Sequence, residues 1–447
     1  MAYTEFIAAI DLGTSRLVGM AGTKNTSTGI LSVIACDTED SDSGIRRGCV
    51  VNVEETAAKI KRLVRKLESK LNGARIAKIY IGIGGQSVHS IDHSVIREVA
   101  EEDIVTEDLK DLLLEECRTY RAESLDILGI VPPVYYVDGN RVQNPAGVPF
   151  RRIEAKYKLI AGRPSLRRHI KACMERTQLK LADILISPLA LADVVLSEDE
   201  KSLGCALVDF GAGVTSVTIY RKGHLADLCV IPLGGHLITK DLTTLPLIES
   251  EAERLKIDYG SAVVGKDEDE SVQVSAVDGI GIQSVKLSKV NHVIGSRMKE
   301  IVENVYAILE ADNLIESLGA GVVITGGASN LRNLAEEMRK RLKKDIRYAA
   351  LRENLMENTS LAAYSEFAAA IGLLSQGDMN CAQITEQTSE RDMFGNEPVA
   401  GAEKTNEPIK VKPVKEPVKK PEQKTPKPSK IGSLFDRLGG IFDDNNL

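Results

Sequence analysis

Apolar residues follow helical spacing in three segments of the chain. They fall three or four positions apart in residues 54–71, in residues 298–309 and again after Asn330. Asn52 followed by Glu55 resembles a capping box, which favours a helix start at that point. Such periodicity predicts helices that bury one face. The three apolar faces are Ile60, Leu63, Val64, Leu67 and Leu71; Met298, Ile301, Val302, Val305, Ile308 and Leu309; and Leu331, Leu334, Met338 and Leu342.

Two short runs, Phe6–Ile10 and Cys205–Val208, are apolar at every position. Continuous apolar runs of this length are typical of central strands that are buried on both faces. Because such strands alternate with the helical segments, the sequence predicts an α/β architecture. At 447 residues the chain is expected to form two to three domains.

The same two runs open a weak internal repeat. Residues 8–15 spell AAIDLGTS, and residues 206–213 spell ALVDFGAG. Each copy is an apolar strand, an aspartate, one apolar residue, and then glycine with small or hydroxyl-bearing neighbours. Two related halves that face each other across a cleft are the simplest explanation.

The first copy has residues suited to a nucleoside triphosphate. Gly13 permits a tight turn with no Cβ in the way. The backbone N–H groups after it, with the hydroxyls of Thr14 and Ser15, can point at phosphate oxygens. Asp11 ends a buried strand and is placed to hold Mg²⁺, directly or through water.

The second copy repeats the arrangement, with Asp209 as a second carboxylate and Gly211, Gly213 and Thr215 around the phosphates. One such loop alone is equally explained by a strand that ends in a hairpin turn, where Asp and Gly are common. Two loops together favour ATP and Mg²⁺ bound between the halves.

Two further segments are candidates for the nucleoside end of the ligand. Residues 322–329, VVITGGAS, are an apolar strand that ends in Gly326 and Gly327, where the backbone can pack flat against an adenosine. Alone, this is an ordinary β–α turn. Glu253 and Lys256 lie three residues apart and can grip the ribose and adenine edge from one helix face. In isolation they equally suit a solvated face.

The composition changes after the folded part, which is expected to end near residue 376. Residues 401–430 hold nine Lys, four Glu and six Pro, which predicts an extended tether. An apolar helical face follows, formed by Ile431, Leu434, Phe435, Leu438, Ile441 and Phe442. This pattern predicts reversible membrane attachment. The alternative is a helix that docks on the folded part or on a partner protein.

Composition excludes several classes of function. The net charge of −7, with no Trp, argues against a nucleic-acid binder. The seven cysteines are scattered without a CxxC pair, so neither a zinc site nor a disulfide framework is expected. No apolar run is long enough for a membrane-spanning helix, so any membrane contact is expected to be peripheral.

The order of these elements resembles the superfamily of actin, Hsp70 and sugar kinases, and the details resemble one branch, the bacterial FtsA cell-division family. The motifs that carry the likeness are RGCVVN at 47–52, IYIGIGG at 79–85, NPAG at 144–147, LSEDEK at 196–201 and the segment 250–260. At the second loop Val214 and Ser216 stand where relatives often have a hydroxyl and an acid. This departure bears on metal geometry and hydrolysis more than on nucleotide binding.

The resemblance implies a ribonuclease H-like, actin-like fold with duplicated halves. The first half would cover residues 1–83 and 163–200, interrupted by an FtsA-type extra subdomain at 84–162. The second half would be 201–377 with a small insertion near 260–290, followed by a disordered linker at 378–429 and a membrane-targeting helix at 430–447. Asp193 falls about where actin-like enzymes place a water-orienting residue, although an exposed helix acid is an equal explanation.

The resemblance also implies partners and a location. FtsA-like proteins bind ATP, polymerise into filaments and anchor the FtsZ ring to the cytoplasmic face of the inner membrane at the division site. The insertion would capture the FtsZ C-terminal tail, and the extra subdomain would contact later division proteins. ATP hydrolysis would be slow at most.

Rival functions within the superfamily stay open at this stage. A sugar or small-acid kinase needs a base near the γ-phosphate, and it has no use for a charged tether that ends in an apolar helix. A chaperone ATPase would carry a large peptide-binding domain after the nucleotide domain. An MreB-like cytoskeletal protein or a pilus-assembly protein is the closer alternative.

Overall fold

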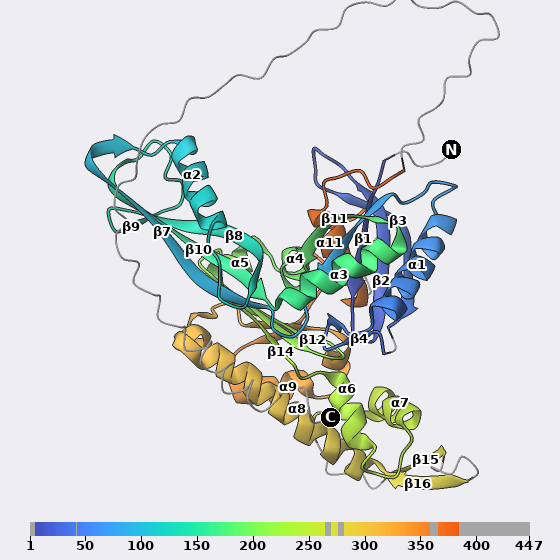
Figure 1. Cartoon of the computed structure of the whole chain (residues 1–447). Helices are drawn as coiled ribbons and strands as arrows, with labels where there is room; N and C mark the ends of the chain where they lie inside the picture. Colours follow the sequence, from blue (N-terminus) through green and yellow to red (C-terminus); the bar gives the residue numbers. More distant parts are fainter. Residues whose placement is uncertain (1–4, 42, 264–269, 276–280, 358–364, 384–447) are drawn as a thin grey trace, which may run out of the picture. The chain divides into compact units, whose positions relative to one another are not determined.

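The computed structural model describes residues 5–41, 43–263, 270–275, 281–357 and 365–383 (Figure 1). The chain divides after Gln383, so the fold is that of the first unit. The disordered linker expected at 378–429 begins too early, because Cys381 and Ala382 are buried and the Cys381 amide donates to the Phe6 carbonyl at 2.7 Å. The rest of the linker from residue 384 on, the targeting helix at 430–447 and its six apolar residues lie outside the described residues.

The first sheet has five strands in the order β11-β6-β1-β2-β3. The central strand β1 runs antiparallel to β2 and parallel to β6. The strands are β1 (Ile7–Leu12), β2 (Arg16–Lys24), β3 (Leu31–Asp40), β6 (Lys78–Ile83) and β11 (Lys180–Ile186), and a short hairpin, β4 (Ile45–Arg46) with β5 (Cys49–Val50), precedes the first long helix.

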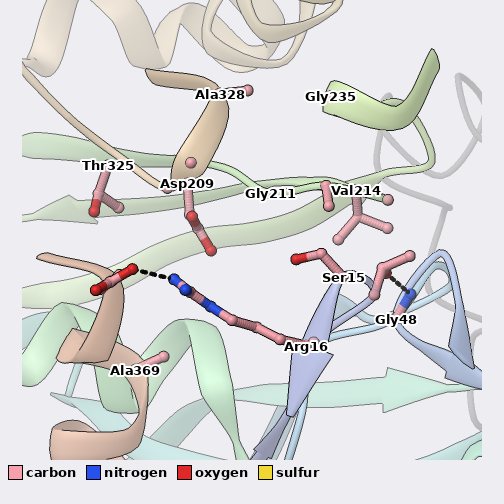
Figure 2. A pocket seen from close by; sticks show the side chains of 18 of the residues that line it. Ser15, Arg16, Gly48, Asp209, Gly211, Val214, Gly235, Thr325, Ala328 and Ala369 are labelled. Atoms are coloured by element: carbon pink, nitrogen blue, oxygen red, sulfur yellow. Dashed lines mark hydrogen bonds and ion pairs between the residues drawn. The ribbon is translucent and has the colours of Figure 1, made fainter. Parts of the chain in front are cut away.

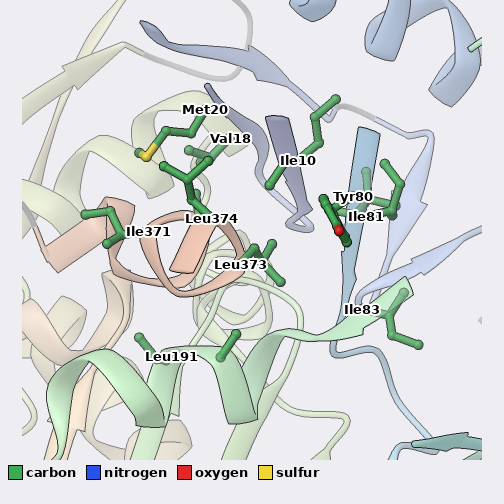
Figure 3. Packing of buried hydrophobic residues seen from close by; sticks show 14 of the residues in the cluster. Ile10, Val18, Met20, Tyr80, Ile81, Ile83, Leu191, Ile371, Leu373 and Leu374 are labelled. Atoms are coloured by element: carbon green, nitrogen blue, oxygen red, sulfur yellow. The ribbon is translucent and has the colours of Figure 1, made fainter. Parts of the chain in front are cut away.

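Two pairs of helices cover this sheet: α1 (Val53–Ser69) with α3 (Pro164–Thr177), and α4 (Ser187–Val195) with α11 (Ala368–Gln376). A Cβ at Gly19 would meet Leu63 and Leu67 of α1, whereas a Cβ at Gly22 would meet Leu374 of α11. The two pairs therefore lie on opposite faces, and Figure 3 shows Leu373 and Leu374 packed near Ile10 and Val18.

The sequence predicts a second half that runs through residue 377, and α11 corrects that boundary. This helix packs on β1, β2 and β6 of the first half. Its apolar residues are buried almost all round, with Ile371, Leu373 and Leu374 at 0 % exposure. A helix of this kind needs apolar neighbours on every side, and the uncovered face of the first sheet supplies them.

The second half repeats the strand order of the first. Five of its strands follow the order β18-β17-β12-β13-β14, and β12 is antiparallel to β13 and parallel to β17. The predicted duplication is thus confirmed. The strands are β12 (Cys205–Phe210), β13 (Thr215–Arg221), β14 (His224–Ile231), β17 (Val322–Thr325) and β18 (Ile346–Tyr348).

Helices of the second half include α5 (Glu198–Leu203), α6 (Gly235–Leu242), α7 (Glu249–Tyr259), α8 (Leu287–Glu310) and α9 (Leu334–Leu342). The helix expected directly after Asn330 instead begins at Leu334, because a 3-10 turn at Gly327–Asn330 precedes it. Two other 3-10 segments are Ala311–Ser317 and Ser365–Phe367. The region near 260–290 contains the hairpin β15 (Ser271–Ser275) and β16 (Ile282–Lys286).

An extra subdomain is inserted between β6 and α3. It contains β7 (His89–Ile104), α2 (Glu107–Arg118), β8 (Asp126–Val137), β9 (Asn140–Val142) and β10 (Pro149–Gly162). It has its own apolar core, which includes Leu113, Phe150 and Tyr157. Its strands extend the sheet of the second half to nine strands, in the order β18-β17-β12-β13-β14-β7-β10-β8-β9, and β7 joins β14 where His89 pairs with Cys229. None of the helices in the described ranges is long and apolar enough to cross a membrane.

Candidate functional site

A cavity of about 510 Å³ lies between the two halves, where β1 and β12 end. This is the usual size of a small-molecule site. Residues from both strand–turn loops line it (Figure 2). Glu253 and Lys256 of α7 line it as well. The structure thereby brings together Asp11, Gly13, Thr14, Ser15, Asp209, Gly211, Gly213, Glu253, Lys256, Gly326 and Gly327.

Hydrogen bonds from neighbouring segments to its side chains and backbone fix the conformation of the first loop. The Ser187 hydroxyl donates to the Asp11 carboxylate at 2.6 Å. The Gly48 amide donates to the Thr14 hydroxyl at 2.8 Å, and the Ser41 hydroxyl donates to the Gly13 carbonyl at 2.6 Å. These bonds fix the loop before any ligand arrives.

The two loops meet each other at Gly213. A Cβ added there would overlap the hydroxyl and methyl groups of Thr14. Only glycine lets the second loop approach the first this closely. The contact brings the ends of the two halves together, so one ligand can reach both loops.

The hydroxyl of Thr215 does not line the cavity, which corrects one predicted site residue. Thr215 is fully buried, and its hydroxyl donates to the Leu233 carbonyl at 2.8 Å. Ser216 lines the cavity in its place. Because β13 begins at Thr215, successive side chains point to opposite faces, and only the second one faces the ligand space.

The two aspartates have raised pKa values. Burial raises the pKa of Asp11, and the hydrogen bond from Ser187 only partly opposes this. Burial, with a smaller contribution from the Asp11 charge, raises the pKa of Asp209 to about 7. Two carboxylates that disfavour each other's charge are suited to a divalent cation. The described residues contain no cluster of three or more metal-ligating side chains, so other Mg²⁺ ligands would be phosphates and waters.

Glu253 and Lys256 form an ion pair at the cavity wall. The Lys256 ammonium donates to Glu253 at 2.6 Å, to the Thr239 hydroxyl at 2.8 Å and to the Gly235 carbonyl at 3.1 Å. Burial opposes the charge on Glu253, but the hydrogen bonds from Lys256 and Thr239 outweigh it and lower its pKa. The three donors of the Lys256 ammonium are already used, so Glu253 is the member of the pair that can accept a hydrogen bond from a ribose hydroxyl.

Gly326 and Gly327 differ in what their backbone requires. Gly326 has a φ of +87°, and a Cβ there would overlap the Asp209 carboxylate. A Cβ on Gly327 would meet nothing within 4 Å. The first glycine is therefore needed by the fold, whereas the second borders open space in the cavity.

Asp193 lies away from the cavity lining. Its carboxylate accepts from Lys201 at 3.1 Å and from Gln376 at 2.9 Å, which links α4 to α5 and α11. The structure therefore does not bring Asp193 together with the two loops. Its contacts are those of a packing and charge partner for the buried Lys201.

Several lining residues were missed by the sequence analysis. Arg16 and Glu366 both line the cavity and form an ion pair of 2.5 Å. Figure 2 shows the Arg16 side chain extending below Asp209. Ser187 and His236 also line the cavity. Arg16 directly follows Ser15 of the first loop, so its position in the sequence could have identified it as a candidate lining residue. No local pattern marks Ser187, His236 or Glu366, since each comes from a segment distant along the chain.

Comparison with known families gives two matches within this fold. The family described as cell division protein FtsA matches residues 206–372, and the SHS2 domain inserted in FtsA matches residues 85–161. Cell division protein FtsA of Porphyromonas gingivalis is 34 % identical over 377 residues, which cover 84 % of this chain and 78 % of that protein. The Bacillus subtilis protein of the same name is 29 % identical, covering 78 % of this chain and 80 % of its own.

Solved structures show the same fold at low sequence identity. A PilM–PilN type IV pilus biogenesis complex aligns with a TM-score of 0.56 and 15 % identity, covering 82 % of this chain and 97 % of that chain. MreB5 of Spiroplasma citri bound to ADP aligns with a TM-score of 0.51 and 14 % identity, covering 83 % and 95 %. The expected actin-like fold is confirmed, and the family matches decide against a pilus or MreB-like identity.

Proposed function

The chain belongs to the FtsA family of cell division proteins, and on this premise we propose that it is an ATP-binding, filament-forming scaffold that anchors the FtsZ ring to the inner membrane. The proposal that the chain binds ATP rests on one observation: eleven predicted residues from both halves line the same cavity. Local patterns far apart in sequence do not meet at one site by chance.

The residues present fit a magnesium nucleotide. The loops at Gly13 and Gly211 would hold the phosphates, Glu253 oriented by Lys256 would hold the ribose, and Gly327 would lie against the adenosine. Mg²⁺ would neutralise phosphate charge, with Asp11 and Asp209 as its carboxylate partners. The raised pKa values of these aspartates support a cation at this point, because a cation relieves their repulsion.

Any hydrolysis by this site is proposed to be slow. Catalysis of phosphoryl transfer depends on groups that position a water or hydroxyl at the γ-phosphate. Asp193, the predicted water-orienting residue, bonds Lys201 and Gln376 instead. We therefore assign nucleotide binding a structural role, which is to hold the two halves together for self-association.

The anchoring role rests on the family and on three regions of the chain. The region near 260–290 is proposed to bind the FtsZ C-terminal tail, and the extra subdomain at 84–162 is proposed to contact later division proteins. The apolar residues at 431–442 are proposed to enter the cytoplasmic face of the inner membrane at the division site. Reversible attachment follows, because six large apolar side chains give limited burial in a bilayer.

Co-flotation with lipid vesicles tests the anchoring role. Purified FtsZ would be mixed with vesicles and either the full chain or a chain that ends at Lys430. The full chain is expected to carry FtsZ to the top of the gradient, and the shortened chain is expected to leave it at the bottom. Equal flotation of FtsZ with both chains, or with neither, would refute the anchoring role.

A further inference from the structure

The chain leaves the described unit at the edge of the first sheet opposite the cavity. The Cys381 amide donates to the Phe6 carbonyl at 2.7 Å, and the Gln383 amide donates to the Arg75 carbonyl at 2.8 Å. These bonds fix residues 381–383 beside the start of β1 and the segment that leads into β6. Asp11, near the other end of β1, lines the cavity.

The two chain segments that lead to this edge are rich in positive charge. Residues 61–78 and 163–180 together hold thirteen Lys and Arg against two Glu, in a chain whose net charge is −7. The two segments contain α1 and α3, which pack against each other (Figure 1). Eight residues separate the end of α1 from β6, and two separate the end of α3 from β11. Because β6 and β11 are parallel, their first residues lie at one edge of the sheet.

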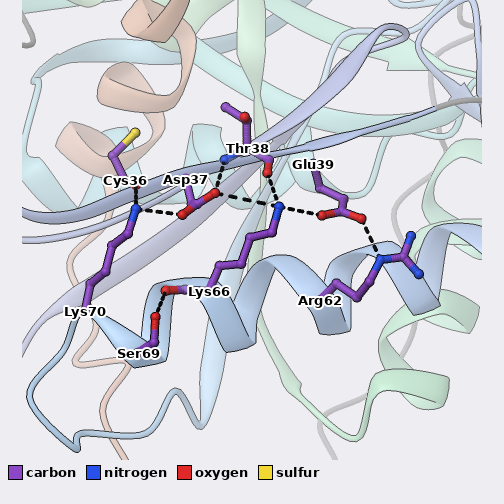
Figure 4. A network of polar contacts seen from close by, with 8 residues as sticks. All are labelled: Cys36, Asp37, Thr38, Glu39, Arg62, Lys66, Ser69 and Lys70. Atoms are coloured by element: carbon purple, nitrogen blue, oxygen red, sulfur yellow. Dashed lines mark hydrogen bonds and ion pairs between the residues drawn. The ribbon is translucent and has the colours of Figure 1, made fainter.

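Some of these cations have carboxylate partners within the fold. Lys70 pairs with Asp37 at 2.6 Å, and Lys66 pairs with Glu39 at 2.7 Å, as Figure 4 shows. Both pairs are on the surface, where such contacts contribute little stability. They lower the charge of the α1 surface without removing it.

Lys78 and Lys180 have no such compensation. They are direct register partners on the parallel strands β6 and β11. Lys180 is exposed and Lys78 is half-buried, and among the described residues neither takes part in an ion pair. Like charges directly opposite each other on neighbouring strands are destabilising. An external anion would relieve this repulsion.

We propose that this basic edge, defined by Lys70, Arg75, Lys78 and Lys180, contacts the anionic headgroups of the bilayer that takes up residues 431–442. The inference rests on the proposed membrane anchoring and extends it. The folded unit would meet the membrane with this edge, and the nucleotide cavity would face away from the lipid.

The position of the chain exit favours a lipid surface over other polyanions. The chain departs at Gln383, within the basic edge, and forty-seven residues separate it from Ile431. Once the apolar segment is in the bilayer, contact by the edge is intramolecular, so a weak site is occupied at the high local concentration. Each Lys or Arg near an anionic surface is worth about 1 kcal/mol, or roughly five-fold in affinity.

Vesicle binding by the full chain tests the proposal. The variant would carry Lys78→Glu with Lys180→Glu, and the control would carry Lys240→Glu with Lys299→Glu. The control lysines are exposed on α6 and α8, have no ion pair in the described structure, and undergo the same charge change. Vesicles would be phosphatidylcholine with or without phosphatidylglycerol, and circular dichroism would verify the fold of each chain.

The basic-edge variant is expected to bind phosphatidylglycerol vesicles roughly ten- to thirty-fold more weakly than the wild type. The basic-edge variant should bind pure phosphatidylcholine vesicles as tightly as the wild type does. The control variant should match the wild-type affinity for both kinds of vesicle. If the basic-edge variant and the control lose vesicle affinity equally, or if the basic-edge variant loses none, the proposed lipid contact of the basic edge is wrong. The proposed anchoring by the apolar residues would still stand. If the wild-type chain does not bind vesicles at all, the membrane anchoring itself fails.

A second readout reports contact without changing charge. The chain has no Trp, so a single one is a clean probe. Ser69→Trp places it at the end of α1 next to Lys70, and Ser296→Trp places it on α8 as the control; both serines are exposed. Headgroup-spin-labelled lipid should quench the indole fluorescence of the Ser69→Trp chain and spare that of the Ser296→Trp chain. Equal quenching in both chains would overturn the proposed orientation.

Discussion

Asp11 and Asp209 occupy equivalent positions in two copies of one strand arrangement. Asp11 lies opposite Val18 on the antiparallel neighbour and Gly82 on the parallel one. Asp209 lies opposite Ser216 and Thr325 in the same relation. Each is the last but one residue of its strand, and both line one cavity. The duplication therefore places two carboxylates at a single site.

The stability of the nucleotide-free protein should fall as the pH rises from about 4 to about 7. The pKa of Asp209 is raised from 3.8 to about 7 in the folded state, so the folded protein binds this proton more tightly than the unfolded chain does. Loss of the proton then removes on the order of 2–4 kcal/mol of stability. Asp209→Asn stays uncharged and should flatten this part of the profile.

Thermal melts without Mg²⁺ or nucleotide, compared at about pH 5 and about pH 8, measure this effect. The difference between wild type and Asp209→Asn isolates the one group from the other titrating residues. If the two profiles run parallel, Asp209 does not carry a raised pKa.

Gly326 and Gly327 should respond differently to a methyl group. Gly327→Ala is expected to leave the melting temperature nearly unchanged, because the new Cβ meets no protein atom within 4 Å, yet to weaken ATP binding. Gly326→Ala should destabilise the fold by more than about 1 kcal/mol, since its φ is +87° and Asp209 is in the way. Melting curves and titration with a fluorescent ATP analogue separate the two. Unchanged ATP affinity in Gly327→Ala would place the adenosine elsewhere.

Lys256→Met should reduce both stability and nucleotide affinity. It leaves Glu253 without the hydrogen bond that helps to lower its pKa. Adding Glu253→Gln removes the unpaired carboxylate and should restore most of the stability but not the affinity. The measurement is the melting temperature and ATP affinity of the two single variants and the double variant. A double variant that regains nucleotide binding would show that the pair only supports the fold.

Asp193→Asn should leave ATP affinity and any ATP turnover within about two-fold of wild type. The side chain bonds Lys201 and Gln376 and does not line the cavity. A modest destabilisation of about 1 kcal/mol is expected, because the largely buried Lys201 loses one of its two carboxylate partners. A turnover assay decides the matter, since a large fall in rate with intact affinity would restore the water-orienting role.

The sequence predicted the parts of the site that depend on local pattern. A continuous apolar run followed by Asp and Gly indicates a strand end, and this was enough for Asp11, Asp209 and the glycines around them. Thr215 was misplaced by one residue, because the start of β13 decides which side chain faces the cavity. A shift of the strand start by one residue moves every side chain of the strand to the opposite face. The amino-acid composition of the segment does not reveal such a shift.

The remaining differences come from long-range packing. The ion pair of Arg16 with Glu366 joins residues 350 positions apart. The return of α11 to the first half is likewise fixed by an apolar sheet face that only the folded chain presents. Neither contact has a periodicity or motif that a single sequence can show.

Equilibrium binding of ATP, with and without Mg²⁺, to the wild-type chain and to the chain with both Asp11→Asn and Asp209→Asn tests the central claim most directly. The amides keep the shape of the carboxylates, and the new amide oxygen at position 11 can still accept from Ser187. Wild type should bind ATP at least about ten-fold more tightly with Mg²⁺ than without it, and the double variant should lose that difference. Equal Mg²⁺ dependence in both chains would contradict a paired-carboxylate site for the magnesium nucleotide.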